Sequence, residues 1–445
     1  MELEVLTSMK PPQLRQLKNF ELLAYLENTW ELYEFLFSSI KEDETYYKSP
    51  DPLRNPLIFY LGHTAAFYIN KLRMAGLWND HVNKEWDQLF AVGVDPDAPE
   101  NLDVAEIWPT VPEVRAYRDK IYEIVKQVIQ NLEIPEYITQ EHSAWAIIMA
   151  MEHDRIHFET SSVLIRQLPT DDVQKPEGWM YAPLENSTDV PPKWITVDDE
   201  TVSLGKPTQC SVYGWDNEYG QLDTEVKRFR AMNVMVTNAQ FLGFVRVGGY
   251  QKSSFWSEEG WQWKEQTKTT GPKFWLNDEG ETFRYRAMFD EIEMPLQWPV
   301  EVNAYEAEAF CNWIGHNVRL LTEAEFKLIA QHECDEEETF PSECNDNFTF
   351  GSPTPVGFVT PRGNQPFYDL YGNVWDWLQD DFYSLPGFKT HPLYEEFSAP
   401  YMDDEHGMMA GGSWATTGTG CSKFYRLWFR RHFFQHAGFR LAQSL

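Results

Sequence analysis

The chain has 445 residues, of which 42% are hydrophobic and 24% are charged, a balance typical of a folded globular protein long enough for two or three domains. Its formal net charge of −32 repels phosphate backbones and anionic lipids, so neither nucleic acid nor a membrane is an expected partner. The five scattered cysteines form no CxxC pair and favour reduced thiols, and the lack of an apolar leader or membrane-spanning run predicts a cytoplasmic location.

The first part of the chain predicts four long helices. Apolar residues recur at helical spacing over 14–40, 55–76, 111–132 and 143–168. Pro56 and Pro112 are placed for first helical turns, Ser143 is an expected N-cap, and Pro169 ends the last helix. Four helices joined by loops predict an antiparallel bundle over 1–168, and the core of such a bundle can hold a metal ion between facing helices.

The remainder of the chain has a different composition. Residues 169–194 are rich in Pro, Asp and Asn without periodicity, which predicts a linker over the surface. From 195 to 445, short segments with many Gly and Trp residues predict strands and loops around aromatic anchors. Only 302–315 and 321–332 predict clear helices there. The expected fold class is therefore α+β.

Two histidines stand four residues apart in the stretch MEHDRIHFET. An α-helix turns about 100° per residue, so His153 and His157 lie about 40° apart on one face and can offer two nitrogens to one ion. Glu159 lies about 200° around the helix from His157, so we expect a structural carboxylate, paired with an arginine. His63, in FYLGHTAAFY, is the expected third ligand from another helix. Three neutral imidazoles suit Fe(II), Zn(II) or Cu(II), while packing in the core is the alternative for all three.

Arg115 and Arg118 lie three residues apart in EVRAYRDK and so share a helix face. One interpretation is a solvated face, on which Glu113 and Asp119 are partners of the arginines. The functional alternative is a guanidinium clamp for a substrate carboxylate, since arginine binds carboxylates in a bidentate fork.

Four motifs follow one another in the second part of the chain. They are YEAEAFCNWIGHNVRLLTEAEF at 305–326, LYGNVWDW at 370–377, GGSWAT at 411–416 and AGFRLA at 437–442. This ordered set resembles the formylglycine-generating (sulfatase-modifying-factor) enzymes, whose loop-rich fold is related to C-type lectins. The resemblance implies that fold for 195–445. No counterpart of that family's active-site cysteine pair is recognisable, so formylglycine formation is not implied.

Together with the HxxxH helix, nearly the full length of the chain resembles the iron-dependent sulfoxide synthases. In that family a DinB-like four-helix bundle precedes a formylglycine-enzyme-like domain, and O2 is used to join the sulfur of a cysteine-type thiol to the imidazole of a histidine derivative. The resemblance implies that His63, His153 and His157 bind Fe(II). It also implies that Arg115 and Arg118 contact the thiol substrate.

The family has two branches that differ in substrate. The ergothioneine branch uses hercynine with cysteine or γ-glutamylcysteine, and the ovothiol branch joins L-cysteine to L-histidine as 5-histidylcysteine sulfoxide. SPDPLRNPLIFYLGHTAAFYINKLRMAG and FRRHFFQHAGFRLA resemble the ovothiol branch. Ile156 stands where many ergothioneine-branch enzymes have glutamine, which also favours histidine.

The ovothiol enzymes often continue into a methyltransferase domain, whereas this chain stops at Leu445. A separate methyltransferase is therefore expected if methylation follows. Ergothioneine-type chemistry remains an alternative, as does a non-catalytic lectin-like binding module.

The family also places a tyrosine of the second domain near the iron, where it steers the reaction away from simple oxidation of the thiol. Tyr394 in HPLYEEF is the preferred counterpart, followed by Tyr383, with Tyr401 also present in this stretch. Arg430 and Arg431, in FRRHFFQH, are expected to shape the amino-acid pocket between the domains. The alternative for both arginines is a structural role with Asp or Glu partners.

Overall fold

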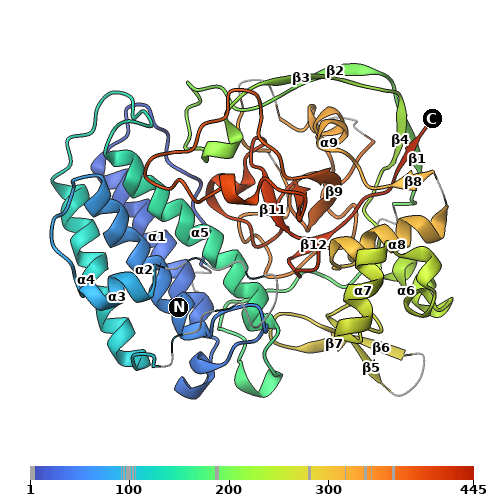
Figure 1. Ribbon diagram of the computed structural model, residues 1–445, viewed down its shortest axis with the longest axis horizontal. Coiled ribbons are helices and arrows are strands. Elements are labelled where there is room, and N and C mark those ends of the chain that lie inside the picture. Colours follow the sequence, from blue (N-terminus) through green and yellow to red (C-terminus); the bar gives the residue numbers. More distant parts are fainter. Residues whose placement is uncertain are drawn as a thin grey trace.

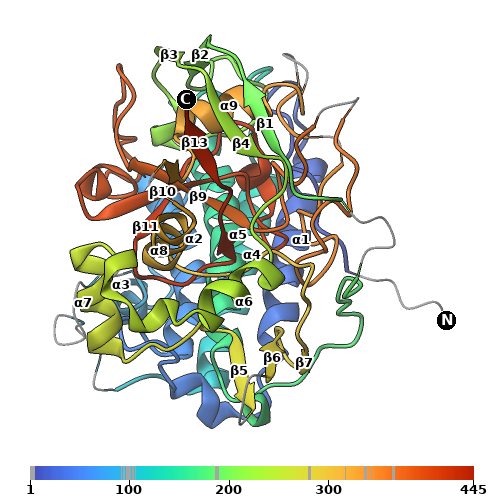
Figure 2. The ribbon, with the colours of Figure 1, turned by 90° about the vertical axis from the view of Figure 1, so that its right-hand side faces the viewer.

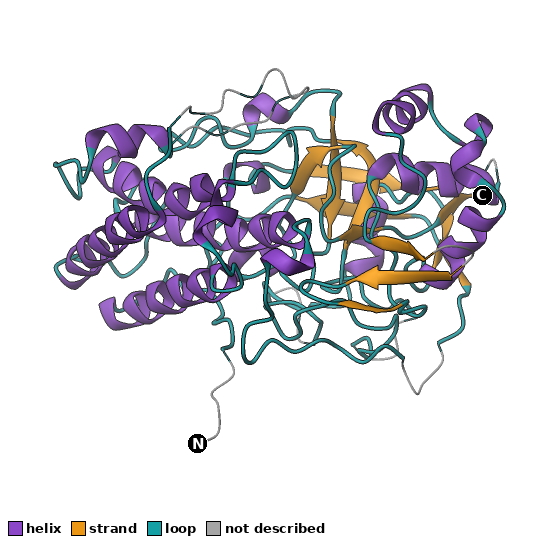
Figure 3. Ribbon diagram, turned by 90° about the horizontal axis from the view of Figure 1, so that it is seen from below, coloured by secondary structure: helices purple, strands orange, loops and turns teal. Residues whose placement is uncertain are grey.

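The computed structural model describes residues 6–91, 93, 96, 102, 105, 107–185, 190–278, 282–315, 317–334, 338–341, 343–362 and 366–445. Within these residues, the long helices gather at one end of the molecule, and the strands with several shorter helices form the other end (Figure 1, Figure 3). The predicted α+β class, with a helical N-terminal part followed by a part that contains the strands, is confirmed.

In the described residues, the N-terminal part contains four long α-helices and one short α-helix. Their bounds are α1 Asn19–Phe37, α2 Leu57–Met74, α3 Lys84–Leu89, α4 Val111–Gln130 and α5 Ala144–Arg166. A capping box of Thr110 and Glu113 begins α4, and Pro112 lies in its first turn. Ser143 is at the N-cap of α5, but its hydroxyl makes no capping hydrogen bond.

The first long helix is shorter than the predicted 14–40. It begins at Asn19 because the preceding backbone is used by other segments. The N–H of Leu14 donates to the carbonyl of Ser211 at 2.6 Å, and the carbonyl of Leu14 accepts from the N–H of Ile138 at 2.9 Å. The first bond ties the start of the chain to the C-terminal part, the second ties it to the loop before α5, and both leave Leu14 outside the helix.

The C-terminal part contains two four-stranded sheets, of order β1-β4-β13-β8 and β11-β10-β9-β12, together with the β2-β3 hairpin and the three-stranded β5-β6-β7 sheet among the described residues. The bounds of its strands are β1 Trp194–Val197, β2 Glu200–Leu204, β3 Leu222–Val226, β4 Phe229–Met232, β5 Trp275–Asp278, β6 Thr282–Arg286, β7 Glu291–Glu293, β8 Val318–Arg319, β9 Trp375–Asp381, β10 His406–Ala410, β11 Leu427–Arg430, β12 Ala437–Gly438 and β13 Ala442–Ser444. The pairing is antiparallel except between β12 and β9.

Four helices accompany these strands in the described residues: α6 Asn238–Arg246, α7 Glu258–Thr267, α8 Ala304–Ile314 and α9 Glu323–Ala330. The last two are the helices predicted over 302–315 and 321–332. Helices α6 and α7 were not predicted from the sequence. A capping box of Thr237 and Gln240 begins α6, and Ser257 caps α7, so local signals for both were present.

Among the long helices of the bundle, α5 lies beside the C-terminal part (Figure 1). Figure 2 looks from the strand-containing end, where β4 and β13 lie in front of the bundle. One hydrophobic core cluster continues from the bundle into the C-terminal part and includes Leu26, Ile148, Trp298 and Trp375. The two parts therefore share apolar packing, and α5 is positioned to carry side chains toward both.

The segment predicted as a linker is held to both parts. Trp179 is 4% exposed, its ring lies 5.9 Å from the ring of Phe35 in α1, and it lies 4.8 Å from the ring of Phe348. All five cysteines are free thiols, as predicted. No helix in the described ranges combines the length and the apolar character needed to span a membrane.

Candidate metal centre

The three predicted histidine ligands lie together in the core of the bundle. His63 comes from α2, while His153 and His157 are one turn apart on α5. One nitrogen of each lies within 4.8 Å of the others, and the ring centroids are 4.5 to 5.0 Å apart. In the described part of the chain, this is the only group of three or more His, Cys, Asp or Glu side chains with that spacing.

Burial keeps these imidazoles neutral. It lowers the pKa of His63 to about 4 and holds the pKa values of His153 and His157 well below their usual range, and the neighbouring histidines lower these further. A neutral imidazole has a lone pair for a metal, whereas an imidazolium has none. All three side chains are therefore in the ligand form at neutral pH.

Hydrogen bonding orients the site and leaves one buried nitrogen without a partner. Nδ1 of His63 lies 2.6 Å from the carbonyl of Phe90, so Nδ1–H donates and Nε2 keeps the lone pair. The ring of Phe67 stacks on His153 at 3.6 Å, and Nδ1 of His153 has no hydrogen-bond partner among the described residues. Three neutral nitrogens with one orphaned buried atom fit a divalent transition metal.

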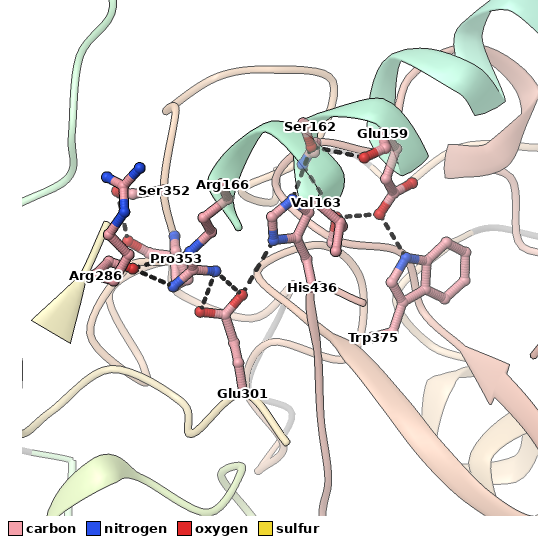
Figure 4. Close-up of polar contacts among 12 residues, drawn as sticks. Glu159, Ser162, Val163, Arg166, Arg286, Glu301, Ser352, Pro353, Trp375 and His436 are labelled. Atoms are coloured by element: carbon pink, nitrogen blue, oxygen red, sulfur yellow. Dashed lines mark hydrogen bonds and ion pairs between the residues drawn. The ribbon is translucent and has the colours of Figure 1, made fainter. Parts of the chain in front are cut away.

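The opposite face of α5 makes hydrogen bonds to the C-terminal part (Figure 4). Glu159 accepts from Trp375 Nε1 at 2.7 Å, from Ser413 Oγ at 2.5 Å and from Thr416 Oγ1 at 2.8 Å. The prediction that Glu159 points away from the histidines agrees with these contacts. The expected arginine partner is wrong, because no ion pair of Glu159 is found in the described ranges, and hydroxyl and indole donors take that place.

Over the next two turns of α5, a buried ionic network continues this docking face (Figure 4). Arg166 donates to both carboxylate oxygens of Glu301 at 2.7 and 2.8 Å, and His436 bridges Glu301 at 3.1 Å and Ser162 at 2.8 Å. Burial alone would raise the pKa of Glu301, but Arg166 and His436 lower it to about 2. The network fixes the orientation of α5 relative to the domain that completes the site.

A cavity of about 200 Å³ opens beside the histidines at the junction of the two parts. Its bundle side includes His63, His157 and Ile156, and its opposite side is largely aromatic. That aromatic wall contains Tyr394, Tyr401, Trp428 and Phe434. The volume lies below the several hundred cubic ångströms of typical drug-sized pockets, so the cavity suits amino-acid-sized molecules.

Of the predicted tyrosines, Tyr394 and Tyr401 line this cavity. The ring of Tyr394 lies 6.1 Å from that of His153 and 5.1 Å from that of Phe67. Tyr383 does not line the cavity. Its ring lies 4.8 Å from the guanidinium of Arg426 instead.

The structure does not bring Arg115 and Arg118 to the cavity. Both guanidinium groups bind Glu34 of α1, at 2.6 and 2.9 Å. Arg118 is fully buried and also donates to the carbonyl of Leu61 at 2.8 Å. These contacts tie α4 to α1 and α2, and they differ from both interpretations of the pair, since neither Glu113 nor Asp119 is the partner.

Arg430 and Arg431 also lie outside the lining of the cavity. Arg430 donates to Glu405 and Arg431 donates to Asp381, so the acidic partners of the structural alternative are present.

Three charged residues of the cavity wall were not predicted from the sequence: Asp51, Arg54 and Glu396. The guanidinium of Arg54 lies 4.0 Å from the ring centroid of Phe433, and its charge contributes to lowering the pKa of His157. Among the described lining residues, Arg54 is the one Lys or Arg side chain. Arg54 lies three residues before α2, the helix that bears His63, and this closeness in sequence was the signal that could have placed it near the metal centre.

Comparison with known proteins places two families along the chain. The family model described as a sulfatase-modifying factor enzyme 1-like domain matches residues 184–445, and the model described as the DinB superfamily matches residues 25–161.

Individual relatives match either about half of the chain or nearly all of it, at 24% to 32% identity. A hercynine oxygenase of Mycobacterium tuberculosis is 32% identical over 53% of this chain and 56% of that protein. A hercynine oxygenase of Mycolicibacterium smegmatis is 26% identical over 95% of this chain and 97% of that protein. Ergothioneine biosynthesis protein 1 of Schizosaccharomyces pombe is 24% identical over 98% of this chain and 57% of that protein. The match therefore spans little more than half the length of the first and third relatives.

Proposed function

Since this chain belongs to the sulfatase-modifying factor enzyme 1-like family and carries a DinB-superfamily bundle before that domain, we propose that it is a nonheme Fe(II), O2-dependent sulfoxide synthase. The observation that carries the proposal is the set of three neutral imidazoles, two buried and one half-buried, beside a cavity at the junction of the two domains. The relatives named hercynine oxygenase support the same reaction class.

The overall reaction joins a thiol RSH and an imidazole C–H with O2. One oxygen atom enters the S=O group and the other leaves as water, so two electrons come from C–S bond formation and two from oxidation of sulfur. Bound Fe(II) would supply the reduction of O2 in this scheme. The protein holds the thiol and the imidazole carbon side by side, which is a contribution of orientation.

Tyr394 is the proposed hydroxyl donor, and we favour it over Tyr383. It lines the cavity, and burial raises the pKa of its phenol above the ordinary value, so the O–H stays protonated at neutral pH. Aromatic side chains lie around it in the cavity wall. An O–H donor positioned beside the reacting sulfur favours coupling over simple thiol oxidation.

Arg54 is the proposed contact for a substrate carboxylate, in place of Arg115 and Arg118. The carboxylate of Glu34 already takes both of those guanidinium groups, and they lower its pKa although burial opposes this. Arg54 lies in the cavity wall, where it is the one Lys or Arg side chain among the described lining residues, and a planar guanidinium matches the geometry of a carboxylate.

Two imidazole substrates compete in this proposal. Ile156, which offers no hydrogen bond to a substrate amine, favours L-histidine with L-cysteine and hence 5-histidylcysteine sulfoxide. The relatives named hercynine oxygenase and ergothioneine biosynthesis protein 1 favour hercynine at least as strongly. If the product is 5-histidylcysteine sulfoxide, a separate methyltransferase would act later in the pathway.

The test is aerobic incubation of Fe(II)-loaded protein with L-cysteine and either L-histidine or hercynine, followed by mass spectrometry of the products. A sulfoxide from histidine supports the ovothiol-type reaction, and a sulfoxide from hercynine alone assigns the ergothioneine type. Cysteine sulfinate as the sole product would make the protein a thiol dioxygenase. The absence of O2 consumption, with iron content unaffected by His63→Ala, would favour a non-catalytic binding module.

A further inference from the structure

Lys71 is a buried ammonium close to the candidate metal centre. It follows His63 by eight residues, about two helical turns, on α2, which places the two side chains about 80° apart around that helix. Lys71 is 8% exposed and does not line the cavity. A cation in such a place needs compensating contacts, because removal of an ammonium from water is costly.

The contacts of Lys71 are unusual for a buried charge. Nζ donates to the backbone carbonyl of Leu393, and it lies 4.3 Å from the ring centroid of Tyr394 and 4.7 Å from that of Phe67. In the described ranges, no carboxylate lies within ion-pair distance of this ammonium. Burial lowers the pKa of Lys71 to about 8, and Glu396 partly offsets that effect.

These contacts join the bundle to the segment that bears Tyr394. The Phe67 ring stacks on His153, the Tyr394 ring meets Phe67 edge-on at 5.1 Å, and Lys71 contacts both of those rings. The segment is also anchored at His391, whose Nε2 lies 3.1 Å from the carbonyl of Gln140. Lys71 of the bundle thus contacts Tyr394 of the C-terminal part across the junction of the two parts.

We infer that Lys71 is a positioning residue for Tyr394, which it orients toward the reacting sulfur by a cation–π contact and a hydrogen bond to Leu393. This inference rests on the proposed function for its chemical consequence, but the placement of Tyr394 can be measured without it. An ammonium over the ring face favours one ring position through the quadrupole of the phenol. The hydrogen bond to the preceding carbonyl limits motion of the backbone.

The experiment compares the full-length protein with Lys71→Met, which keeps the length of the side chain but removes charge and donors, and with Lys71→Arg, which keeps both. Lys126→Met is the matched control, because Lys126 also makes a cation–π contact, at 5.0 Å from the ring of Tyr122 on α4, and does not line the cavity. Thermal unfolding and iron content establish that each variant is folded and can bind metal.

The first readout is hydrogen–deuterium exchange in metal-free protein. We expect residues 391–397 to exchange at least about fivefold faster in Lys71→Met, as local opening becomes easier, and to remain near the wild type in Lys71→Arg and Lys126→Met. The second readout is the ratio of sulfoxide to cysteine sulfinate in Fe(II)-loaded protein. We expect Lys71→Met to lower that ratio at least about fivefold with O2 consumption within about twofold, and Lys71→Arg to restore it.

The outcomes separate the two proposals. Unchanged exchange in Lys71→Met would overturn the inference, and faster exchange with an unchanged product ratio would reduce Lys71 to a structural clamp and overturn its positioning role. If the wild type forms no sulfoxide, the proposed function fails, and the exchange measurement still decides whether Lys71 holds this segment.

Discussion

The two long faces of α5 differ in how fully their polar groups are satisfied. On the docking face, Glu159 accepts three hydrogen bonds and Arg166 donates to a carboxylate and a backbone carbonyl. On the cavity face, Nδ1 of His153 has no partner in the described ranges, and Nδ1 of His157 has only a 3.5 Å contact with Thr160. The hydrogen-bonded side chains of the docking face hold the domains together. The histidine nitrogens of the cavity face, which lack strong hydrogen bonds within the protein, are available to bind a ligand such as a metal ion.

The largest expected effect comes from a change on the cavity face. His157→Ala should lower iron content at least about tenfold and abolish sulfoxide formation, because two imidazoles are a poor site for a divalent ion. The unfolding temperature of the metal-free protein should change little, because the substitution removes a polar ring that has given up its contacts with water. Metal analysis, product mass spectrometry and calorimetry measure these effects.

His142→Ala is the control for that substitution. His142 lies just before α5, and its Nδ1 accepts from the backbone N–H of Ala144 at 3.1 Å. This variant should keep its iron. Retention of iron in His157→Ala as well would contradict the three-histidine site.

The complementary change lies on the docking network. Glu301→Gln leaves the buried guanidinium of Arg166 without a carboxylate, and the free energy of unfolding should fall by about 3–5 kcal/mol. Chemical denaturation measures it. Glu291→Gln, which breaks the more exposed pair with Arg284, should cost less than about 1 kcal/mol. Equal effects of the two substitutions would contradict the stabilising role of the buried docking network.

The same carboxylate predicts a dependence of stability on pH. The pKa of Glu301 is lowered from 4.5 to about 2, so its contribution, about 3 kcal/mol, is present above pH 4.5 and is lost as the pH falls toward 2. Unfolding free energies measured across this range should show that loss. In Glu301→Gln, the free energy of unfolding should depend less on pH between 4.5 and 2. The same dependence in the variant as in the wild type would assign the acid sensitivity to other groups.

The smallest expected effect concerns substrate affinity. Arg54→Met should raise KM for the amino acid whose carboxylate it binds by about 10- to 100-fold, the size of a lost charge-assisted hydrogen bond, and change kcat little. Arg115→Met, which removes a contact to Glu34, should leave KM unchanged. A KM effect from Arg115 alone would restore the clamp that the sequence analysis expected.

Patterns among residues that are near one another in sequence were enough to predict much of the fold. Helical periodicity found α2, α4 and α5, and the four-residue spacing placed His153 and His157 on one face, because both depend only on the geometry of a single helix. The third histidine needed the assumption of a bundle, and ordered motifs in the second domain were needed to choose iron. Short helices such as α6 and α7 were hidden among aromatic and glycine residues despite their caps.

The sequence by itself therefore determined the helical bundle, the α+β class and the pairing of the two histidines on α5, since these follow from neighbours along the chain. Only the tertiary structure decided which arginine meets the cavity, because Glu34 of α1 captures Arg115 and Arg118, whereas Arg54 lies in the wall. It likewise brought Lys71 to Tyr394, more than three hundred residues away along the chain, through the packing of the two domains. Contacts of this kind depend on how the faces of distant elements meet, and no local spacing encodes that meeting.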